Sequence, residues 1–219
     1  MLPVVLEDPL DHTALTRMKT WLEHCDNSHN RCAYLHERKF QLPTRLLDLR
    51  SLPGYTQMIH QGRNWSTLFA NRHCKLIETT LNQHDRYATL SYCWGDSLVY
   101  TTTSKNIEAH KLGIEVERLP GTLRDAIRVA RYFDIPYIWI DCLCIVQDSR
   151  ADWAQESGRM ATVYSCSYLN IAASRASHVG NGFLGLRDVP LKHEVSINDN
   201  EGTFELYFVG PHKVSQRYQ

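Results

Sequence analysis

The sequence predicts an α/β protein in which a sheet of parallel strands lies between two layers of helices. Residues 137–146 form an apolar run rich in β-branched and aromatic residues, which is typical of a strand covered on both faces. Similar runs occur at 87–95 and 168–173, and a helical pattern separates each pair of runs. This alternation specifies right-handed crossovers in a parallel sheet. The chain has 219 residues, which is long enough to bury a substantial core.

The first connecting helix is expected just after Leu119-Pro-Gly. Thr122 is the predicted N-cap, and Asp125 three residues later completes a capping box. An apolar stripe at helical spacing is predicted to face the sheet. It consists of Leu123, Ala126, Ile127, Ala130 and Phe133.

The second connecting helix is expected over residues 152–164, with Ser149 as its cap and Asp152 three residues on. The stripe of Trp153, Met160 and Tyr164 is predicted to be buried, and Glu156 lies beside it. Burying a carboxylate without a partner is costly. Two interpretations stay open. Either Glu156 flanks the stripe and pairs with Arg159, or Glu156 and Asp141 both face a pocket.

Additional elements are predicted outside this core. Residues 11–24 have a helical pattern, with Leu15, Met18, Trp21 and Leu22 on one stripe. Segments 43–50 and 74–80 alternate like half-buried strands, and they can pair as an antiparallel addition to the main sheet. Segments 193–197 and 203–209 alternate like a hairpin.

These patterns divide the chain into three predicted regions. A helical lead-in covers residues 1–42, the α/β core covers 43–190, and a hairpin extension covers 191–219. The C-terminal end has no stop signal, so we expect the chain to be part of something longer.

Composition excludes several functional classes. Lys plus Arg and Asp plus Glu both number 24, which argues against a nucleic-acid or anionic-membrane binder. No apolar run approaches the ~20 residues of a membrane span. The N-terminus lacks the basic start and apolar region of a secretory signal. Seven cysteines, an odd number, fit a cytoplasmic protein with reduced thiols better than a disulfide scaffold.

Cysteine and histidine residues raise two further hypotheses. Cys25, His29 and Cys32 are soft metal ligands close together, and His73-Cys74 could complete a zinc set, but nothing in the sequence requires a metal, and capping and core packing explain these residues better. We therefore expect no metal.

A cysteine nucleophile is the other hypothesis. It would use Cys93, Cys142 or Cys144 with a histidine partner, but all three lie where inert buried thiols are expected.

A candidate binding site follows from the predicted topology, because ligands of open parallel sheets bind beyond the carboxyl ends of the strands. The residues expected there are Ser91, Tyr92, Trp94, Gly95, Asp141, Asp148 and Ser174, joined by Trp153 and Glu156 of the second helix. Such a set suits a ligand with a sugar and a ring, since carboxylates bind ribose hydroxyls and aromatic faces pack on a base. Neither a Walker lysine nor a glycine-rich dinucleotide fingerprint is present.

Four motifs resemble the fungal heterokaryon-incompatibility (HET) domain. They are residues 87–95, 119–127, 137–148 and 152–160, and the resemblance extends over roughly residues 43–187. The segment from Trp21 to Cys32 also looks like the usual lead-in to that domain. The resemblance implies a cytoplasmic effector of non-self recognition and programmed cell death in a filamentous fungus. Such domains are often joined to receptor modules.

The HET domain is in turn distantly similar to Toll/interleukin-receptor (TIR) domains. This second resemblance implies a three-layer flavodoxin-like sheet whose first strand carries a Ser-Tyr pair, here Ser91-Tyr92. Several TIR domains cleave NAD with a glutamate. By analogy, Glu156 and Asp141 are the candidate catalytic residues, NAD is the candidate substrate, and no cofactor is required. The TIR glutamate lies on a helix after a different strand, so Glu156 is not its strict equivalent.

The resemblance also leaves a second function open. A non-enzymatic module can kill by self-association, as a homo-oligomer formed on activation by a receptor or incompatibility partner protein. In that case Trp94, Trp153 and Glu156 serve the fold and the interface.

Overall fold

A computed structural model describes residues 7–29, 42–50, 72–80, 83–95, 100–187, 192–199 and 202–209. The chain divides into two compact units. One is Lys19–Phe183, and the other combines Met1–Met18 with Leu184–Gln219. Each unit is described by itself.

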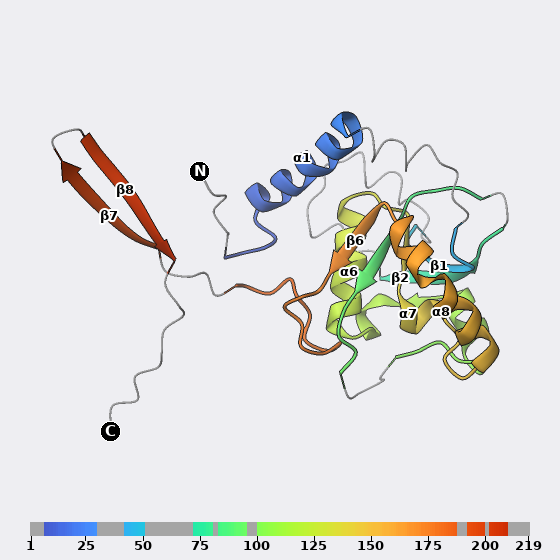
Figure 1. Ribbon diagram of the computed structural model, residues 1–219. Coiled ribbons are helices and arrows are strands. Elements are labelled where there is room, and N and C mark those ends of the chain that lie inside the picture. Colours follow the sequence, from blue (N-terminus) through green and yellow to red (C-terminus); the bar gives the residue numbers. More distant parts are fainter. Residues whose placement is uncertain are drawn as a thin grey trace, which may run out of the picture. The chain divides into compact units, whose positions relative to one another are not determined.

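The larger unit contains a six-stranded sheet in the order β4-β2-β1-β5-β3-β6 (Figure 1). The strands are β1 Arg45–Asp48, β2 His73–Glu78, β3 Tyr87–Ser91, β4 Ile114–Glu115, β5 Tyr137–Trp139 and β6 Leu169–Ala172. The helices are α5 Ile107–Leu112, α6 Gly121–Tyr132, α7 Asp141–Cys144 and α8 Arg150–Ser165, together with a 3-10 turn at Val116–Arg118. The α/β prediction is confirmed.

The centre of the sheet is parallel. Strand β3 pairs in parallel with β5 on one side and with β6 on the other, as the alternation of strands and helices predicts. Strand β1 is antiparallel to both β5 and β2, which confirms the predicted antiparallel addition. In the smaller unit, β7 Lys192–Asp199 and β8 Gly202–Val209 form the predicted hairpin as a separate two-stranded sheet.

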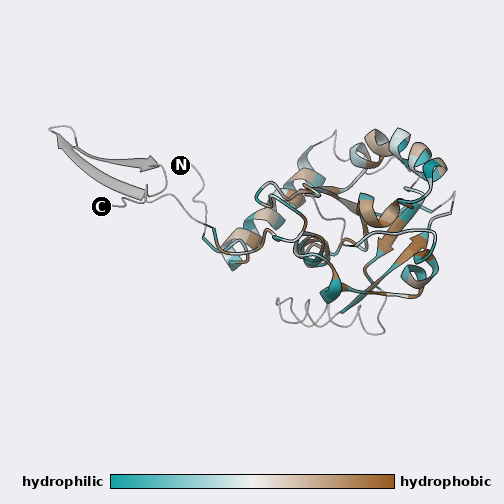
Figure 2. Ribbon diagram, turned by 90° about the horizontal axis from the view of Figure 1, so that it is seen from below, coloured by the Kyte–Doolittle hydropathy of each residue, from teal (hydrophilic) through white to brown (hydrophobic). Residues whose placement is uncertain are grey.

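Helices α6 and α8 cover opposite faces of this sheet (Figure 1). Side chains of β3 alternate between the two faces. On one face the Tyr87 hydroxyl donates to the Val163 carbonyl of α8, and on the other the apolar Leu90 is fully buried. Figure 2 shows hydrophobic strands between these helices. The predicted stripe of α6 is confirmed, since four of its five residues have no exposed surface.

The apolar run at 137–146 does not remain a strand to its end. Strand β5 stops at Trp139, and Asp141–Cys144 form the short helix α7. The N–H groups of Leu143 and Cys144 both donate to the Ile140 carbonyl, which closes the turn. Cys142, Leu143 and Cys144 are buried in this short helix. A buried strand has the same apolar composition, so the sequence does not distinguish the helix from a strand. The turn places Asp141 directly after the strand.

The predicted capping box of α6 is wrong. The helix begins at Gly121, after Pro120. Thr122 and Asp125 instead hold a loop, because the Thr122 hydroxyl accepts from the Gly182 N–H and the Asp125 carboxylate accepts from the Phe183 N–H. Both side chains therefore bind the backbone of a distant loop and do not cap the helix.

The cap of α8 is confirmed, since Ser149 Oγ accepts from the Asp152 N–H at 3.3 Å. The N-terminal helix is also confirmed as α1, His12–Ser28. Its predicted stripe is only partly buried. Leu15 is 5% exposed, whereas Trp21 is 59% exposed.

Candidate functional site

The clearest polar cluster lies at the carboxyl ends of β3 and β5. The indole Nε1–H of Trp94 donates to Asp141 Oδ2 at 2.8 Å, and the Cys142 N–H donates to Asp141 Oδ1 at 2.7 Å. The Tyr92 ring stacks on that of Trp94 with centroids 6.4 Å apart. The structure thus brings together three of the predicted site residues.

Burial and hydrogen bonding act in opposite directions on Asp141. Burial raises the pKa of Asp141 above its ordinary value, because the charged form loses solvation. Hydrogen bonds from Trp94 and Cys142 oppose this rise, because they stabilise the charged form. Burial is the larger effect, so the site contains a carboxyl group with a raised proton affinity.

Two residues from other parts of the chain hold helix α7, on which Asp141 lies. Thr102 uses its N–H to bind the Cys142 carbonyl and its hydroxyl to bind the Leu143 carbonyl, at 2.9 and 2.7 Å. Arg45 Nε donates to the Cys144 carbonyl at 2.7 Å. The last carbonyls of a helix have no partners within it. Here they are satisfied from outside, which fixes the orientation of the whole turn.

Glu156 is buried on the sheet side of α8 and is only 1% exposed. Its Oε1 accepts from the Thr44 hydroxyl at 2.7 Å, and Thr44 in turn accepts from Arg159 Nη1 at 2.7 Å. Glu156 and Arg159 therefore meet through Thr44. The other carboxylate oxygen, Oε2, is buried and has no hydrogen-bond partner in the described part of the chain.

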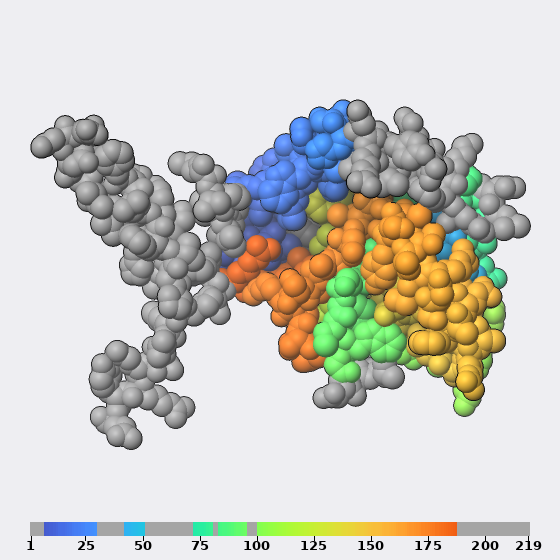
Figure 3. Space-filling view, viewed as in Figure 1, coloured from blue at the N-terminus to red at the C-terminus, as the bar shows by residue number. Residues whose placement is uncertain are grey.

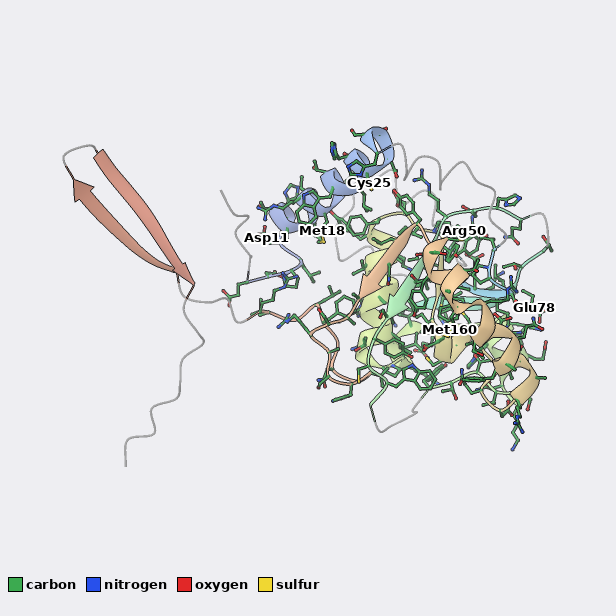
Figure 4. All side chains as sticks on the ribbon, in the orientation of Figure 1. Asp11, Met18, Cys25, Arg50, Glu78 and Met160 are labelled. Atoms are coloured by element: carbon green, nitrogen blue, oxygen red, sulfur yellow. The ribbon has the colours of Figure 1, made fainter. Side chains whose placement is uncertain are left out.

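An ion pair joins α8 to β1. Arg45 Nη2 lies 2.5 Å from Asp152 Oδ2, and the same oxygen accepts from the Val146 N–H at 2.8 Å. Both side chains are largely buried, with 7% and 18% of their surface exposed. Side chains of α8 further along the helix, including Met160, pack against the core (Figure 4). The N-terminal end of α8 is thus attached to β1 through polar contacts.

The remaining predicted site residues are more dispersed. The Asp148 carboxylate is bound by the N–H and hydroxyl of Ser104, which hold the pKa of Asp148 below its ordinary value. Ser91 and Ser174 are exposed, one at the end of β3 and the other in the turn after β6. The predicted burial of Trp153 is wrong, because its side chain is 55% exposed. The buried face of α8 contains Glu156 instead.

Sequence reasoning missed several residues that build this edge of the sheet. Thr44, Arg45 and Thr102 hold the two carboxylate-bearing helices, and His178 lies against Gly95. Figure 3 shows the end of β3 in green at the surface, between α8 in gold and the segment after β6 in orange. In the sequence these four residues are marked only by their polar character beside apolar runs, and this does not indicate a role.

The cysteines remain free thiols in the described residues. Burial raises the pKa of Cys142 to about 12, and it also raises the pKa of Cys144. A thiol with a raised pKa is a poor nucleophile at neutral pH. Cys93 is exposed at the end of β3.

The possible metal ligands lie partly outside the described residues. Cys25, labelled in Figure 4, has its Sγ 3.4 Å from His29 Nδ1, while Cys32 is not among the residues described. Within the described ranges, no group of three His, Cys, Asp or Glu side chains could hold a metal ion. Nor does any helix in those ranges have the length and apolar character to cross a membrane.

Comparison with known proteins gives one match. A family model described as "Heterokaryon incompatibility protein (HET)" matches residues 87–216, more than half of the chain. The match includes β3, α7 and α8, and therefore Asp141 and Glu156. Neither the curated proteins nor the solved structures give a significant match.

Proposed function

The chain belongs to the heterokaryon incompatibility (HET) family, and this membership indicates a role in heterokaryon incompatibility and cell death. From this premise we propose that it is a cell-death effector that hydrolyses NAD at the bond between nicotinamide and ribose. The proposed site is the carboxyl edge of β3 and β5.

The proposed reaction adds water to C1′ of the nicotinamide ribose. The bond between C1′ and the ring nitrogen breaks, its electron pair stays on that nitrogen, and neutral nicotinamide leaves. The attacking water loses one proton, so the products are nicotinamide, ADP-ribose and a proton. The transition state resembles an oxocarbenium ion, which carboxylates stabilise in glycoside cleavage.

The observation that carries the proposal is the contact of Asp141 with Trp94 and Tyr92. Trp94 Nε1–H and the Cys142 N–H orient the two carboxylate oxygens, at 2.8 and 2.7 Å. The stacked Tyr92 and Trp94 rings provide an aromatic face next to this carboxylate. Such a combination suits a ligand that joins a ribose to a planar base. In the proposal Asp141 binds a ribose hydroxyl or stabilises the developing charge, and the aromatic pair holds the base.

Glu156 takes the role of the second carboxylate in this proposal. Its Oε2 is buried without a hydrogen-bond partner in the described residues, an arrangement that costs free energy. With 1% of its surface exposed, Glu156 requires a shift of α8 to reach a ligand. In the proposal, Asp141 is available to a ligand in the present arrangement of the helices, and Glu156 reaches the ligand only after α8 has shifted.

A cell-based experiment tests the proposed function. Wild-type protein fused to an inducible oligomerisation module is expressed in a fungal host, and NAD content and viability are followed together. We expect NAD to fall before viability, and Asp141→Asn to abolish both effects at equal protein abundance. Death without any loss of NAD would contradict the hydrolase proposal.

A second candidate function, killing by self-association without catalysis, rests on Trp153. Its indole is 55% exposed on α8, where a buried position was expected. Exposed tryptophans are frequent anchors of protein interfaces. In this alternative Trp153→Ser abolishes both self-association, measured by light scattering, and killing. Under the hydrolase proposal, Trp153→Ser with enforced clustering still depletes NAD.

A further inference from the structure

His178 lies in the loop that follows β6 and contacts Gly95, in the segment that follows β3. A Cβ atom on Gly95 would lie 2.6 Å from the Cβ of His178, which is closer than real atoms approach. Gly95 also has a φ of 71°, in the left-handed region that favours glycine. The Val179 N–H donates to the Trp94 carbonyl at 3.4 Å. The loop is therefore fitted against the residues that carry the aromatic pair.

The hydrogen bonds of the loop fix the tautomer of His178. The Gly180 N–H is an obligatory donor and lies 3.1 Å from His178 Nδ1, so Nδ1 is the acceptor. In the neutral ring the proton is then on Nε2. The side chain is exposed, and Nε2 has no hydrogen-bond partner in the described ranges. His178 thus presents a single N–H donor to the solvent beside the site.

The base of the loop is held from α6, which limits its movement. The Thr122 hydroxyl contacts the His178 carbonyl at 3.4 Å, and the Thr122 N–H donates to the Val179 carbonyl at 2.9 Å. A Cβ on Gly180 would lie 3.0 Å from the His178 ring, so this glycine also leaves room for it. Ligand-binding groups act best when their orientation is fixed before binding.

We infer that His178 is a ligand-binding residue of this site and that its Nε2–H binds the phosphate oxygens of a phosphate-bearing ligand. This inference rests on the proposed function. It assigns a residue to the phosphates of the dinucleotide, which the Asp141 cluster does not bind in the proposal. Asp141 accepts hydrogen bonds, so it suits ribose hydroxyls and repels phosphate. The Nε2–H of His178, which is a donor, has the complementary property. Trp94 donates its indole N–H to Asp141, and its carbonyl accepts from the N–H of Val179, the residue after His178.

Two matched variants separate ligand binding from loop structure. In His178→Asn the side-chain Oδ1 takes the place of Nδ1 and still accepts from the Gly180 N–H, but the donor at Nε2 is lost. In His178→Gln the amide nitrogen takes the place of Nε2, while the acceptor for Gly180 is lost. We measure binding calorimetrically with ADP-ribose, inorganic pyrophosphate and adenosine, and we record the melting temperature of each variant.

The expected result is that His178→Asn weakens ADP-ribose and pyrophosphate binding on the order of tenfold, with adenosine binding and melting temperature unchanged. His178→Gln is expected to retain most of the affinity and to melt at a lower temperature. Equal binding by wild type and His178→Asn overturns the inference. So does a wild-type protein that binds neither phosphate-bearing probe.

The outcome also separates this inference from the proposed function. Pyrophosphate binding that depends on His178, in a clustered protein that releases no nicotinamide from NAD, supports the phosphate site and refutes NAD hydrolysis. The opposite result is also informative. If Asp141→Asn abolishes nicotinamide release and His178→Asn does not change the KM for NAD, the phosphate site is refuted and the hydrolase is supported.

Discussion

The two helices that cover the sheet are attached to it by different chemistry. Helix α6 buries an apolar stripe of Leu123, Ala126, Ile127 and Ala130 with no exposed surface, beside three buried polar residues, Thr122, Asp125 and Arg131. Helix α8 buries only Glu156 and Val163. Its attachment combines the packing of Val163, Met160 and Tyr164 against the core with hydrogen bonds and the Arg45–Asp152 ion pair. One sheet therefore has a mainly apolar face and a partly polar face.

This difference separates stability from function. Apolar burial is non-directional and contributes about 25 cal/mol per Å². Buried polar contacts add little net stability but fix geometry, because each must be satisfied in one arrangement. The carboxylates Asp141 and Glu156 both depend on the polar contacts around α7 and α8. We conclude that α6 mainly stabilises the fold and that α8 mainly positions the candidate site.

The largest effect is expected at Arg45, which joins α7 and α8 to β1. Arg45→Met removes the donor to the Cys144 carbonyl and leaves the Asp152 carboxylate with the Val146 N–H but no cation, and removing one member of a buried pair costs about 3–5 kcal/mol. The free energy of unfolding from urea titration checks this. The matched control is Arg45→Met with Asp152→Asn, which removes the unpaired charge, keeps an oxygen for the Val146 N–H and is expected to recover part of the loss. A cost below ~1 kcal/mol for the single variant would show that the contact is not important for α8.

A smaller effect is expected at Glu156. Glu156→Ala removes the acceptor of the Thr44 hydroxyl and is expected to cost about 1–3 kcal/mol. Glu156→Gln keeps an oxygen for Thr44 and should cost less than Glu156→Ala. Thermal denaturation of the two variants side by side provides the comparison. If both variants melt with the wild type, Thr44 does not hold Glu156 as the structure indicates.

Gly158 should respond in the opposite direction. It lies in the middle of α8, and a Cβ atom added there meets nothing within 4 Å. Glycine in a helix is less favourable than alanine by about 0.5–1 kcal/mol, so Gly158→Ala should stabilise the protein by that amount. Loss of killing in this more stable variant would indicate that another chain packs closely on α8, in favour of self-association.

The last prediction concerns the pH dependence that Asp141 contributes. Its pKa is raised in the folded state from 3.8, so the folded state binds the proton more tightly than the unfolded state. Its contribution to stability is therefore most favourable at low pH and declines as pH rises through the folded pKa. Asp141→Asn should remove this decline, so at pH 7 its melting temperature should be no lower than that of wild type. Below pH ~4 the melting temperature of wild type should rise relative to that of the variant. A variant that is clearly less stable at pH 7 would make Asp141 a structural carboxylate.

The sequence predicted the apolar face better than the polar face. The stripe of α6 and the parallel order of β3, β5 and β6 followed from periodicity, because apolar burial leaves a regular pattern. The same rule failed on α8, where it placed Trp153 inside and left open whether Glu156 flanks the apolar stripe or faces a pocket. Helix α7 was also missed, because a buried turn and a buried strand have the same composition.

The candidate site was predictable only in part. Asp141, Trp94 and Tyr92 were found from their position at strand ends, and the structure brings them into contact. Arg45 and His178 could not be found, because their roles depend on contacts across 99 and 83 residues of chain, to Cys144 and Gly95. No local pattern encodes such contacts.

The most direct test of the central proposal is nicotinamide release from NAD by purified protein clustered on a bivalent tether. Wild type is assayed beside Asp141→Asn and Glu156→Gln, each checked for an unchanged fold by circular dichroism. The account predicts release by wild type and none by Asp141→Asn. Clustered wild-type protein that kills cells and releases no nicotinamide would contradict it and favour self-association.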